Sequence, residues 1–381
     1  MTKKSVYLDY AAATPVDDRV MDAMEPYFSK NFFNPSANYL LAQKIKDNID
    51  QARKQVALNI GVKSNEIIFT AGGSEANNLA ISGVMDNNPG SNLIISAIEH
   101  PSVSEPAKKY DLKICPVDSQ GLLKLSNLKE LINDQTALIS VIYVSNEIGT
   151  IEPLDKISHL ISEIRKSRLM RGVKVPLYLH SDAAQAANYL DLHVSRLGLD
   201  MMTLNGGKIY GPKQSGALYL KSGCRLKPII YGGGQERNLR SGTLNVPSII
   251  GFAKSLDLAQ QNRKDNAQRI LKLQQYFIDQ LQTLEVDLVV NGSLNSRVAN
   301  NVHVTFKGVD NEALLIKLDL AGIMAAAGSA CSASSEEPSS VLKAIGLSDL
   351  DAQSSIRFTL GNQTTKNELD YTVSTLKKLL K

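Results

Sequence analysis

A lysine among glycines is the first feature of this sequence that suggests chemistry. Lys208 ends the run Asn205-Gly206-Gly207-Lys208 just past a predicted buried strand, so its amine could be held close to a ligand. Asp182 follows another predicted strand, and side chains at the carboxyl ends of parallel strands point into the crevice where such sheets bind ligands. Taken alone, a surface turn would also explain Lys208, and a helix-capping role would also explain Asp182.

A glycine-containing turn at residues 70–75 could hold an anion. Its sequence, Thr-Ala-Gly-Gly-Ser-Glu, follows a predicted strand and opens a predicted helix. Glycines let backbone N–H groups approach an anion, and a helix N-terminus favours a phosphate. The turn is therefore a candidate anion site, although a plain strand-to-helix turn has the same pattern. His100 and Asn146 follow two further strands, so several strand-end loops could line one crevice.

A possible nucleophile and a possible anion partner lie near the end of the chain. Cys331 lies in the small-residue segment 328–334, where polar neighbours favour an exposed, reactive thiol over a buried, inert one. Arg357 interrupts an otherwise apolar strand at 355–360. Its side chain either faces water at a sheet edge or points inward to an anion such as a substrate carboxylate.

The composition excludes several classes of protein. Hydrophobic residues make up 43% of the 381 residues and charged residues 21%, as in ordinary globular proteins. The net charge of +4 is small and dispersed, so we expect no direct nucleic-acid partner. We expect no membrane span, because no run of about 18 apolar residues exists, and the N-terminus lacks the apolar core of a signal peptide. The three cysteines form no metal or disulfide pattern, which predicts a reducing cytoplasm.

The first 250 residues alternate between short apolar runs and helical patterns. Helices are expected at 42–59 and 75–85, and such alternation predicts an α/β fold with a mostly parallel sheet between helices. The expected strands are 66–70, 93–96, 137–144, 177–180 and 201–204.

The pattern changes after about residue 250. One long helix is expected at 249–284, and the strands and C-terminal helix that follow predict a smaller α+β domain. We therefore place a large domain at 15–250 and a small domain at 1–14 plus 251–381. The segment 325–340 has few large side chains to anchor it, so we expect it to be mobile. The later strands are expected at 286–290, 301–306 and 355–360.

These ordered motifs resemble, nearly end to end, the cysteine desulfurases of the class V aminotransferase family, which are pyridoxal-phosphate (PLP) enzymes of fold type I. Segment 328–334 is similar to the long loop that carries the thiol in the NifS/IscS-like branch. The resemblance also rests on 7–15, Asn34-Pro35-Ser36, Gly233-Gly234-Gln235-Glu236, Arg240-Ser241-Gly242-Thr243 and 357–361.

The resemblance implies a role for each candidate residue. Lys208 would hold PLP as a Schiff base and remove the Cα proton, and Asp182 would pair with the pyridinium nitrogen. His100 would stack on the ring and serve in proton transfer. Cys331 would take the sulfur of L-cysteine as a persulfide, releasing alanine, and Arg357 would bind the substrate carboxylate. The other implied contacts are Asn146 and Gln185 around the ring oxygen and substrate, Gly73, Ser74 and Asn205 at the phosphate, and Thr243 reaching the phosphate of a neighbouring subunit in a homodimer.

The sulfur would pass from Cys331 to an acceptor protein, either a scaffold for iron–sulfur clusters or a tRNA-thiolating enzyme. Two alternatives remain open. One is a different PLP reaction, that of a selenocysteine lyase or an aminotransferase; Cys331 argues only against the aminotransferase, because transamination needs no thiol. The other is a non-catalytic scaffold that kept the fold, against which the full set of candidate residues argues.

Three positions depart from the family pattern. Gly207 stands where a histidine usually precedes the lysine, Asn205 stands where serine is usual, and residues 37–43 lack a histidine often found there. Gly207 has no side chain, so it cannot make the contact to the cofactor phosphate that the histidine side chain makes in relatives. We expect Asn205 or a water to replace that contact, since ordered water can replace a direct hydrogen bond at small cost.

Overall fold

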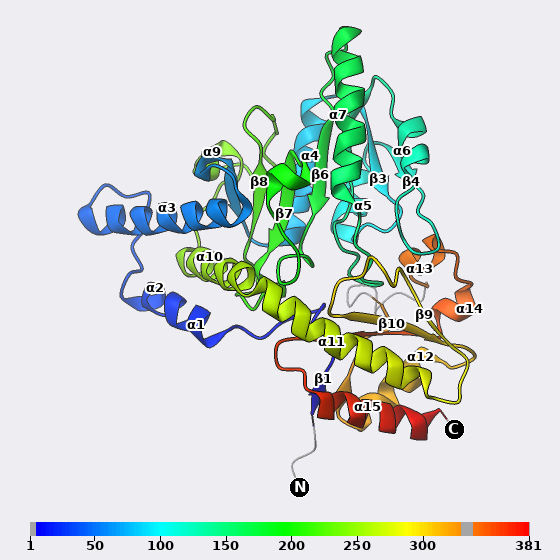
Figure 1. Ribbon diagram of the computed structural model, residues 1–381. Helices are drawn as coiled ribbons and strands as arrows, with labels where there is room; N and C mark the ends of the chain where they lie inside the picture. The colour runs from blue at the N-terminus through cyan, green and yellow to red at the C-terminus, as the bar shows by residue number, and fades with distance from the viewer. Residues whose placement is uncertain (1–4, 329–337, 381) are drawn as a thin grey trace.

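The structure is a computed structural model that describes residues 5–328 and 338–380 (Figure 1). A seven-stranded sheet forms its larger part, in the order β2–β8–β7–β6–β5–β3–β4. Strand β8 is antiparallel to both neighbours and the other pairs are parallel, which confirms the predicted mostly parallel α/β fold. The strands are β2 (Ile67–Thr70), β3 (Asn92–Ser96), β4 (Asp111–Cys115), β5 (Thr136–Ser140), β6 (Tyr178–Asp182), β7 (Met201–Asn205) and β8 (Gly216–Leu220).

Helices cover both faces of this sheet, so its inner strands are apolar on both sides. In β3, Leu93 and Ile95 face the core under α4 (Gly73–Asn87), whereas Ile94 faces the core under α7 (Leu154–Met170). The second face is also covered by α3 (Leu40–Ile60), whose buried residues recur at helical spacing. Gly61 ends α3 with a φ of 70°, the left-handed conformation that glycine adopts most readily at a helix C-terminus.

The strand expected at 137–144 is shorter than predicted, because β5 ends at Ser140. Beyond that point Val141 and Tyr143 donate to the carbonyls of His180 and Asp182, so the chain follows β6 and then turns away. Strands β4 and β8 were not predicted. Residues of β4 are largely exposed at the sheet edge, so they lack the continuous apolar pattern of a central strand.

The single helix expected at 249–284 is two helices, α10 (Val246–Gln261) and α11 (Arg263–Gln282). The break falls at Asn262, whose backbone leaves the helical conformation and whose side chain donates to the Leu258 carbonyl at 2.9 Å. Helix α10 packs on α3 and α1 (Asp18–Met24), whereas α11 packs on α15 (Lys366–Leu379). The break therefore lets two consecutive helices pack against different neighbours.

The second unit is built on an antiparallel sheet of β9 (Leu288–Val290), β10 (Asn301–Phe306) and β12 (Ser355–Thr359), with β10 in the centre. The N-terminal strand β1 (Val6–Tyr7) pairs in parallel with β11 (Ile323–Met324), and a bridge between Asp9 and Thr359 joins them to this sheet. The proposed domain boundaries stay a prediction.

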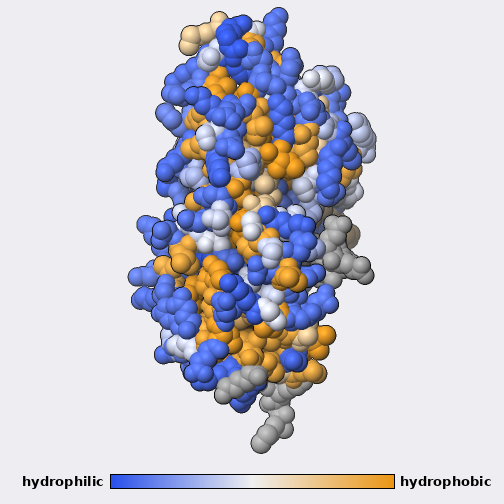
Figure 2. Space-filling view, turned by 90° about the vertical axis from the view of Figure 1, so that its right-hand side faces the viewer, coloured by the Kyte–Doolittle hydropathy of each residue, from blue (hydrophilic) through white to orange (hydrophobic). Residues whose placement is uncertain are grey.

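Figure 1 shows the smaller unit at the lower end of the molecule, with β1 beside α15. Figure 2 shows a face turned by 90°, on which apolar side chains form patches between polar ones, most extensively in its lower half. Within the described part of the chain, no helix is long and apolar enough to cross a membrane. The remaining short elements are α2 (Pro26–Ser29), η1 (Ser64–Glu66), α5 (Pro101–Ala107), α6 (Leu125–Leu131), α8 (Val194–Leu197), η2 (Gly206–Lys208), α9 (Gln235–Asn238), α12 (Asn311–Leu320), α13 (Ser340–Ala344) and α14 (Asp349–Ala352).

Candidate active site

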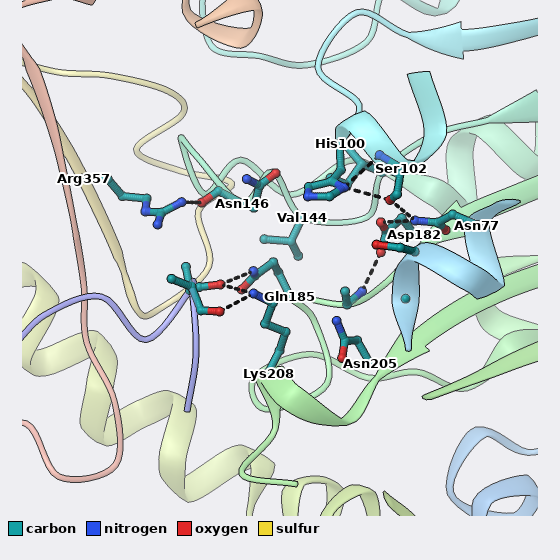
Figure 3. A pocket seen from close by; sticks show the side chains of 16 residues that line it. Asn77, His100, Ser102, Val144, Asn146, Asp182, Gln185, Asn205, Lys208 and Arg357 are labelled. Atoms are coloured by element: carbon teal, nitrogen blue, oxygen red, sulfur yellow. Dashed lines mark hydrogen bonds between the residues drawn. The ribbon is translucent and has the colours of Figure 1, made fainter. Parts of the chain in front are cut away.

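One cavity lies at the carboxyl ends of the central strands and brings together all the predicted site residues except Thr243 and Cys331 (Figure 3). Its walls come from the large sheet, from residues 11 and 12 after β1, and from β12 of the small sheet. The predicted residues that line it are Gly73, Ser74, His100, Asn146, Asp182, Gln185, Asn205, Lys208 and Arg357.

Asp182 is the last residue of β6 and is only 5% exposed. Its Oδ1 accepts from the Ala184 backbone N–H at 2.9 Å, and its Oδ2 accepts from Asn77 Nδ2 at 2.7 Å. Both donors are uncharged, and no lysine or arginine of the described residues forms an ion pair with Asp182. The carboxylate is thus a buried acceptor whose charge a protonated ring nitrogen could balance.

Lys208 ends η2 and extends its amine into the cavity (Figure 3). Nζ donates to the carbonyls of Ala11 at 2.9 Å and Ala12 at 2.5 Å. Asn188 donates to the Lys208 carbonyl at 2.8 Å and so holds its backbone. The amine of Lys208 is therefore placed by the segment that follows β1, far away in sequence.

The start of α4 is the anion site predicted at residues 70–75. Gly72 precedes the helix with a φ of 131° and, as a glycine, has no side chain to cap the first turn. The amide nitrogen of Asn205 lies above Gly73, where a Cβ atom would come within 3.3 Å of it. Asn205 Oδ1 accepts from the Gly207 backbone at 3.0 Å, which directs its nitrogen toward the helix. The helix N-terminus and a side-chain donor thus converge on one place, as phosphate binding requires.

His100 precedes α5 and faces the cavity opposite Lys208 (Figure 3). Burial lowers its pKa; Asp182 opposes this shift and Lys208 adds to it. The ring is therefore neutral near pH 7. The Ser102 backbone N–H donates to Nδ1 at 3.1 Å, and Ser102 Oγ lies 2.7 Å from the same atom.

Arg357 points inward, which resolves the two alternatives left by its position in a strand. Its side chain is 1% exposed. Nη2 donates to Asp9 Oδ1 at 2.7 Å, and Nη1 donates to the Asn146 carbonyl at 3.0 Å. The guanidinium is therefore anchored by both the segment after β1 and the loop after β5, at the end of the cavity farthest from the α4 N-terminus (Figure 3).

Two predicted residues are not in the cavity as described. Thr243 is exposed and lines a separate hollow beside Arg240 and Ser248. Cys331 and most of the segment expected to be mobile lie outside the described residues.

Sequence reasoning missed Asn77 and Ser102, which both line the cavity. Asn77 is fully buried inside α4, and its nitrogen binds both Asp182 and Ser102. The available indication was a polar residue on the apolar side of a helix, beside Ala76, Leu79 and Ala80. Ser102 carried no such indication, because a serine after His-Pro is unremarkable in a helix start.

Comparison with known proteins shows the enzyme family to which the chain belongs. The aminotransferase class-V family model matches residues 6–372, and the chain belongs to this family of PLP-dependent enzymes. Its relatives include cysteine desulfurase IscS of Dictyoglomus turgidum, 40% identical over 99% of this chain and 95% of the relative. Cysteine desulfurase IscS 1 of Archaeoglobus fulgidus is 38% identical over 96% of this chain and 94% of the relative.

Solved structures agree in fold. A NifS-like protein superposes with a TM-score of 0.90 at 29% identity, over 99% of each chain. A NifS-like protein from Rickettsia africae superposes with a TM-score of 0.88, also at 29% identity and over 99% of each chain. These likenesses confirm fold type I for this chain.

The cavity fits PLP on its own chemistry. It holds an amine at Lys208, a buried carboxylate at Asp182 that forms no ion pair with a described lysine or arginine, and a helix N-terminus at Gly73 and Ser74. The spread of these groups matches a molecule with an aldehyde, a basic ring nitrogen and a phosphate.

The role of Gly207 can be tested by substitution, because a Cβ atom has room at this position. A Cβ atom at Gly207 would meet nothing closer than Asn205 Oδ1 at 3.5 Å. We expect Gly207→His to change PLP affinity by less than about tenfold, or about 1.4 kcal/mol. The reason is that Asn205 already directs a hydrogen-bond donor to the anion site at the α4 N-terminus. Equilibrium titration of the apo-proteins with PLP measures this.

The neighbouring glycine provides the matched control. A Cβ atom at Gly206 would lie 2.1 Å from Ser215 Oγ, so Gly206→Ala should lower thermal stability as well as PLP affinity. A gain far above tenfold in Gly207→His would show that the native phosphate site is weakened and would favour a non-catalytic scaffold.

Proposed function

We propose that the protein is a PLP-dependent cysteine desulfurase that transfers the sulfur of L-cysteine to Cys331 and releases L-alanine. The observation that carries the proposal is the arrangement in one cavity of Lys208, Asp182 and His100 between an anion site and a buried arginine. Two observations support L-cysteine as the substrate. The relatives are cysteine desulfurases, and the solved structure of SspA in complex with cysteine is similar to this chain at 33% identity and a TM-score of 0.79.

Each residue then has a defined task. When bound, PLP withdraws electrons from the Cα atom of an attached amino acid. Lys208 supplies the amine that holds the cofactor and afterwards takes the Cα proton. Asp182 keeps the ring nitrogen protonated, and the α4 N-terminus with Asn205 holds the phosphate. Gln185, whose amide donates to the Ala11 carbonyl at 2.9 Å, faces the same space as the Lys208 amine.

Arg357 is proposed to bind the substrate carboxylate at the far end of the cavity. We expect Arg357→Lys to raise KM for L-cysteine by roughly 10- to 100-fold with a smaller change in kcat, since hydrogen bonds to charged groups contribute about 1.5–3 kcal/mol. Steady-state kinetics of alanine release measure both constants. Arg19→Lys, which alters an exposed ion pair with Asp17, is the matched control. An unchanged KM in a folded Arg357→Lys protein would mean that another group binds the carboxylate.

We also propose a homodimer. Apolar side chains of α2, α3 and their connection are exposed, together with Tyr231. Segments 35–38 and 233–236 line one hollow together with Leu244, which also lines the neighbouring hollow that contains Thr243. A second copy packed here would bury this apolar area and could receive Thr243 at its own phosphate site. The apolar side chains concerned are Phe28, Phe32, Tyr39, Leu40 and Tyr231.

The persulfide sulfur is proposed to pass to an acceptor protein, a scaffold for iron–sulfur clusters or a tRNA-thiolating enzyme. Exposed Ile316 and Leu320 of α12 and Leu350 of α14 offer it an apolar contact surface. The start of α12 lies near the end of α14, since the Asn311 backbone donates to the Gln353 carbonyl, and α14 follows soon after the Cys331 segment in the sequence.

The deciding experiment incubates the PLP-loaded protein with L-cysteine and measures L-alanine and the mass of the Cys331 peptide. We expect alanine release and a peptide heavier by one sulfur atom. Each candidate acceptor, added in turn, should speed alanine release if it takes the sulfur. L-selenocysteine in place of L-cysteine tests the lyase alternative. If neither amino acid gives alanine, the result would contradict the proposal and favour the non-catalytic scaffold.

A further inference from the structure

In the chain of hydrogen bonds that links Asp182, Asn77, Ser102 and His100, the donor and the acceptor of each bond can be assigned. Asn77 Nδ2 lies 2.7 Å from Asp182 Oδ2 and 2.8 Å from Ser102 Oγ (Figure 3). An ionised carboxylate only accepts hydrogen bonds, so the nitrogen of the Asn77 amide, not its oxygen, must face Asp182. The second hydrogen of that nitrogen then points to Ser102 Oγ, which acts as its acceptor.

The Ser102 hydroxyl is the donor in its hydrogen bond with His100. Because its oxygen accepts from Asn77, the hydroxyl hydrogen is available to the nearest acceptor, His100 Nδ1, at 2.7 Å. The Ser102 backbone N–H donates to the same nitrogen at 3.1 Å. Two donors thus point at Nδ1, which leaves no room for a hydrogen on that atom. In the neutral ring, the hydrogen must lie on Nε2.

The groups around the ring support this state. The charged groups that act on His100 are Asp182, which raises its pKa, and Lys208, which lowers it, and burial outweighs both. A proton could enter only at Nδ1, and there it would have to displace both donors from Ser102.

We propose that Asn77 and Ser102 are positioning residues that hold His100 as the neutral Nε2–H tautomer, so that His100 meets its ligand as a hydrogen-bond donor and not as a base. This deepens the proposed function and rests on it for the role of His100 in the cavity. In the resting enzyme, Nε2 offers its hydrogen to an acceptor such as an oxygen or a thiolate. Proton abstraction then belongs to the Lys208 amine alone.

Nitrogen NMR of the PLP-loaded protein with ¹⁵N-labelled histidine tests the tautomer. The chain has five histidines, so the spectrum is simple, and loss of one signal set in His100→Gln assigns the ring. We expect Nδ1 of His100 to show the shift of a bare ring nitrogen and Nε2 that of a protonated one. A wild-type spectrum with the hydrogen on Nδ1 overturns the proposal.

Variants of Ser102 test whether its hydroxyl positions the His100 ring or only fills space beside it. Ser102→Ala removes one of the two donors to Nδ1, so we expect the pKa of His100 to rise by about half to one unit, as the net loss of one hydrogen bond implies. Ser102→Thr keeps the hydroxyl and should behave as wild type. Ser104→Ala, on the same helix but outside the cavity, is the control.

Equal pKa values in Ser102→Ala and wild type would refute the role of the hydroxyl. These NMR readouts do not depend on turnover. A protein that releases no alanine but shows the Nε2–H tautomer would refute the proposed function and leave the positioning of His100 intact.

Discussion

Replacing Lys208 by alanine should abolish covalent capture of PLP and reduce alanine release from L-cysteine by roughly 10²–10⁴-fold or more, the range that a positioned acid–base group alone contributes. The amine lies in the cavity between the anion site and Arg357, held by the carbonyls of Ala11 and Ala12. No described lysine other than Lys208 lines this cavity.

Borohydride treatment of the wild-type protein, followed by peptide mass analysis, should place the PLP adduct on Lys208. Lys208→Arg is the informative companion, because it keeps a positive charge near the two carbonyls but cannot form the covalent bond. Lys213→Ala is the control: its amine donates to the Thr14 carbonyl outside the cavity. An adduct on Lys213, or on any other lysine, would disprove the site assignment.

Replacing Cys331 by alanine should leave PLP binding intact but eliminate the persulfide. The cofactor should still change its absorption when L-cysteine is added, because the residues that bind the substrate and PLP are unchanged. Peptide mass analysis after incubation with L-cysteine detects the added sulfur. Sulfide release at the wild-type rate in Cys331→Ala would show that another group accepts the sulfur.

The two other cysteines provide matched controls. Burial raises the pKa of Cys115 and of Cys224 to about 12 in each case. At pH 7 roughly one such thiol in 10⁵ is ionised, and only the thiolate is an effective nucleophile. Cys115→Ala and Cys224→Ala should therefore retain persulfide formation.

Much of the fold was predictable because the buried strands are continuous apolar runs. Strands β2, β3, β6 and β7 were found within one or two residues of their bounds. The edge strand β4 was missed because Asp111 and Lys113 break its apolar pattern. The break between α10 and α11 was missed because Asn262 is a mild helix breaker whose effect depends on two different packing surfaces.

The candidate site was predictable where its residues follow strands, because the carboxyl ends of parallel strands meet at one sheet edge. His100, Asn146 and Asp182 were found in this way, and Lys208 follows β7 likewise. Arg357 could not be oriented from sequence alone, since its direction depends on Asp9 and Asn146, both more than 200 residues away. Ser102 was missed because its role depends on a contact with the buried amide of Asn77 on another helix, which its own sequence surroundings do not show.

The wall that holds the Lys208 amine has a consequence for synthesis on the ribosome. Ala11 is fixed by Thr359, whose Oγ1 accepts from the Ala11 backbone at 2.9 Å, and Thr359 donates to the Leu8 carbonyl. Chains are made from the N-terminus, so residues 8–12 must wait for nearly the whole polypeptide before this wall can form. A nascent chain that stalls before β12 carries the lysine and the phosphate turn but lacks the enclosing wall. We therefore expect a chain truncated before β12 to bind PLP more weakly than the complete chain, because Thr359 is not there to fix Ala11.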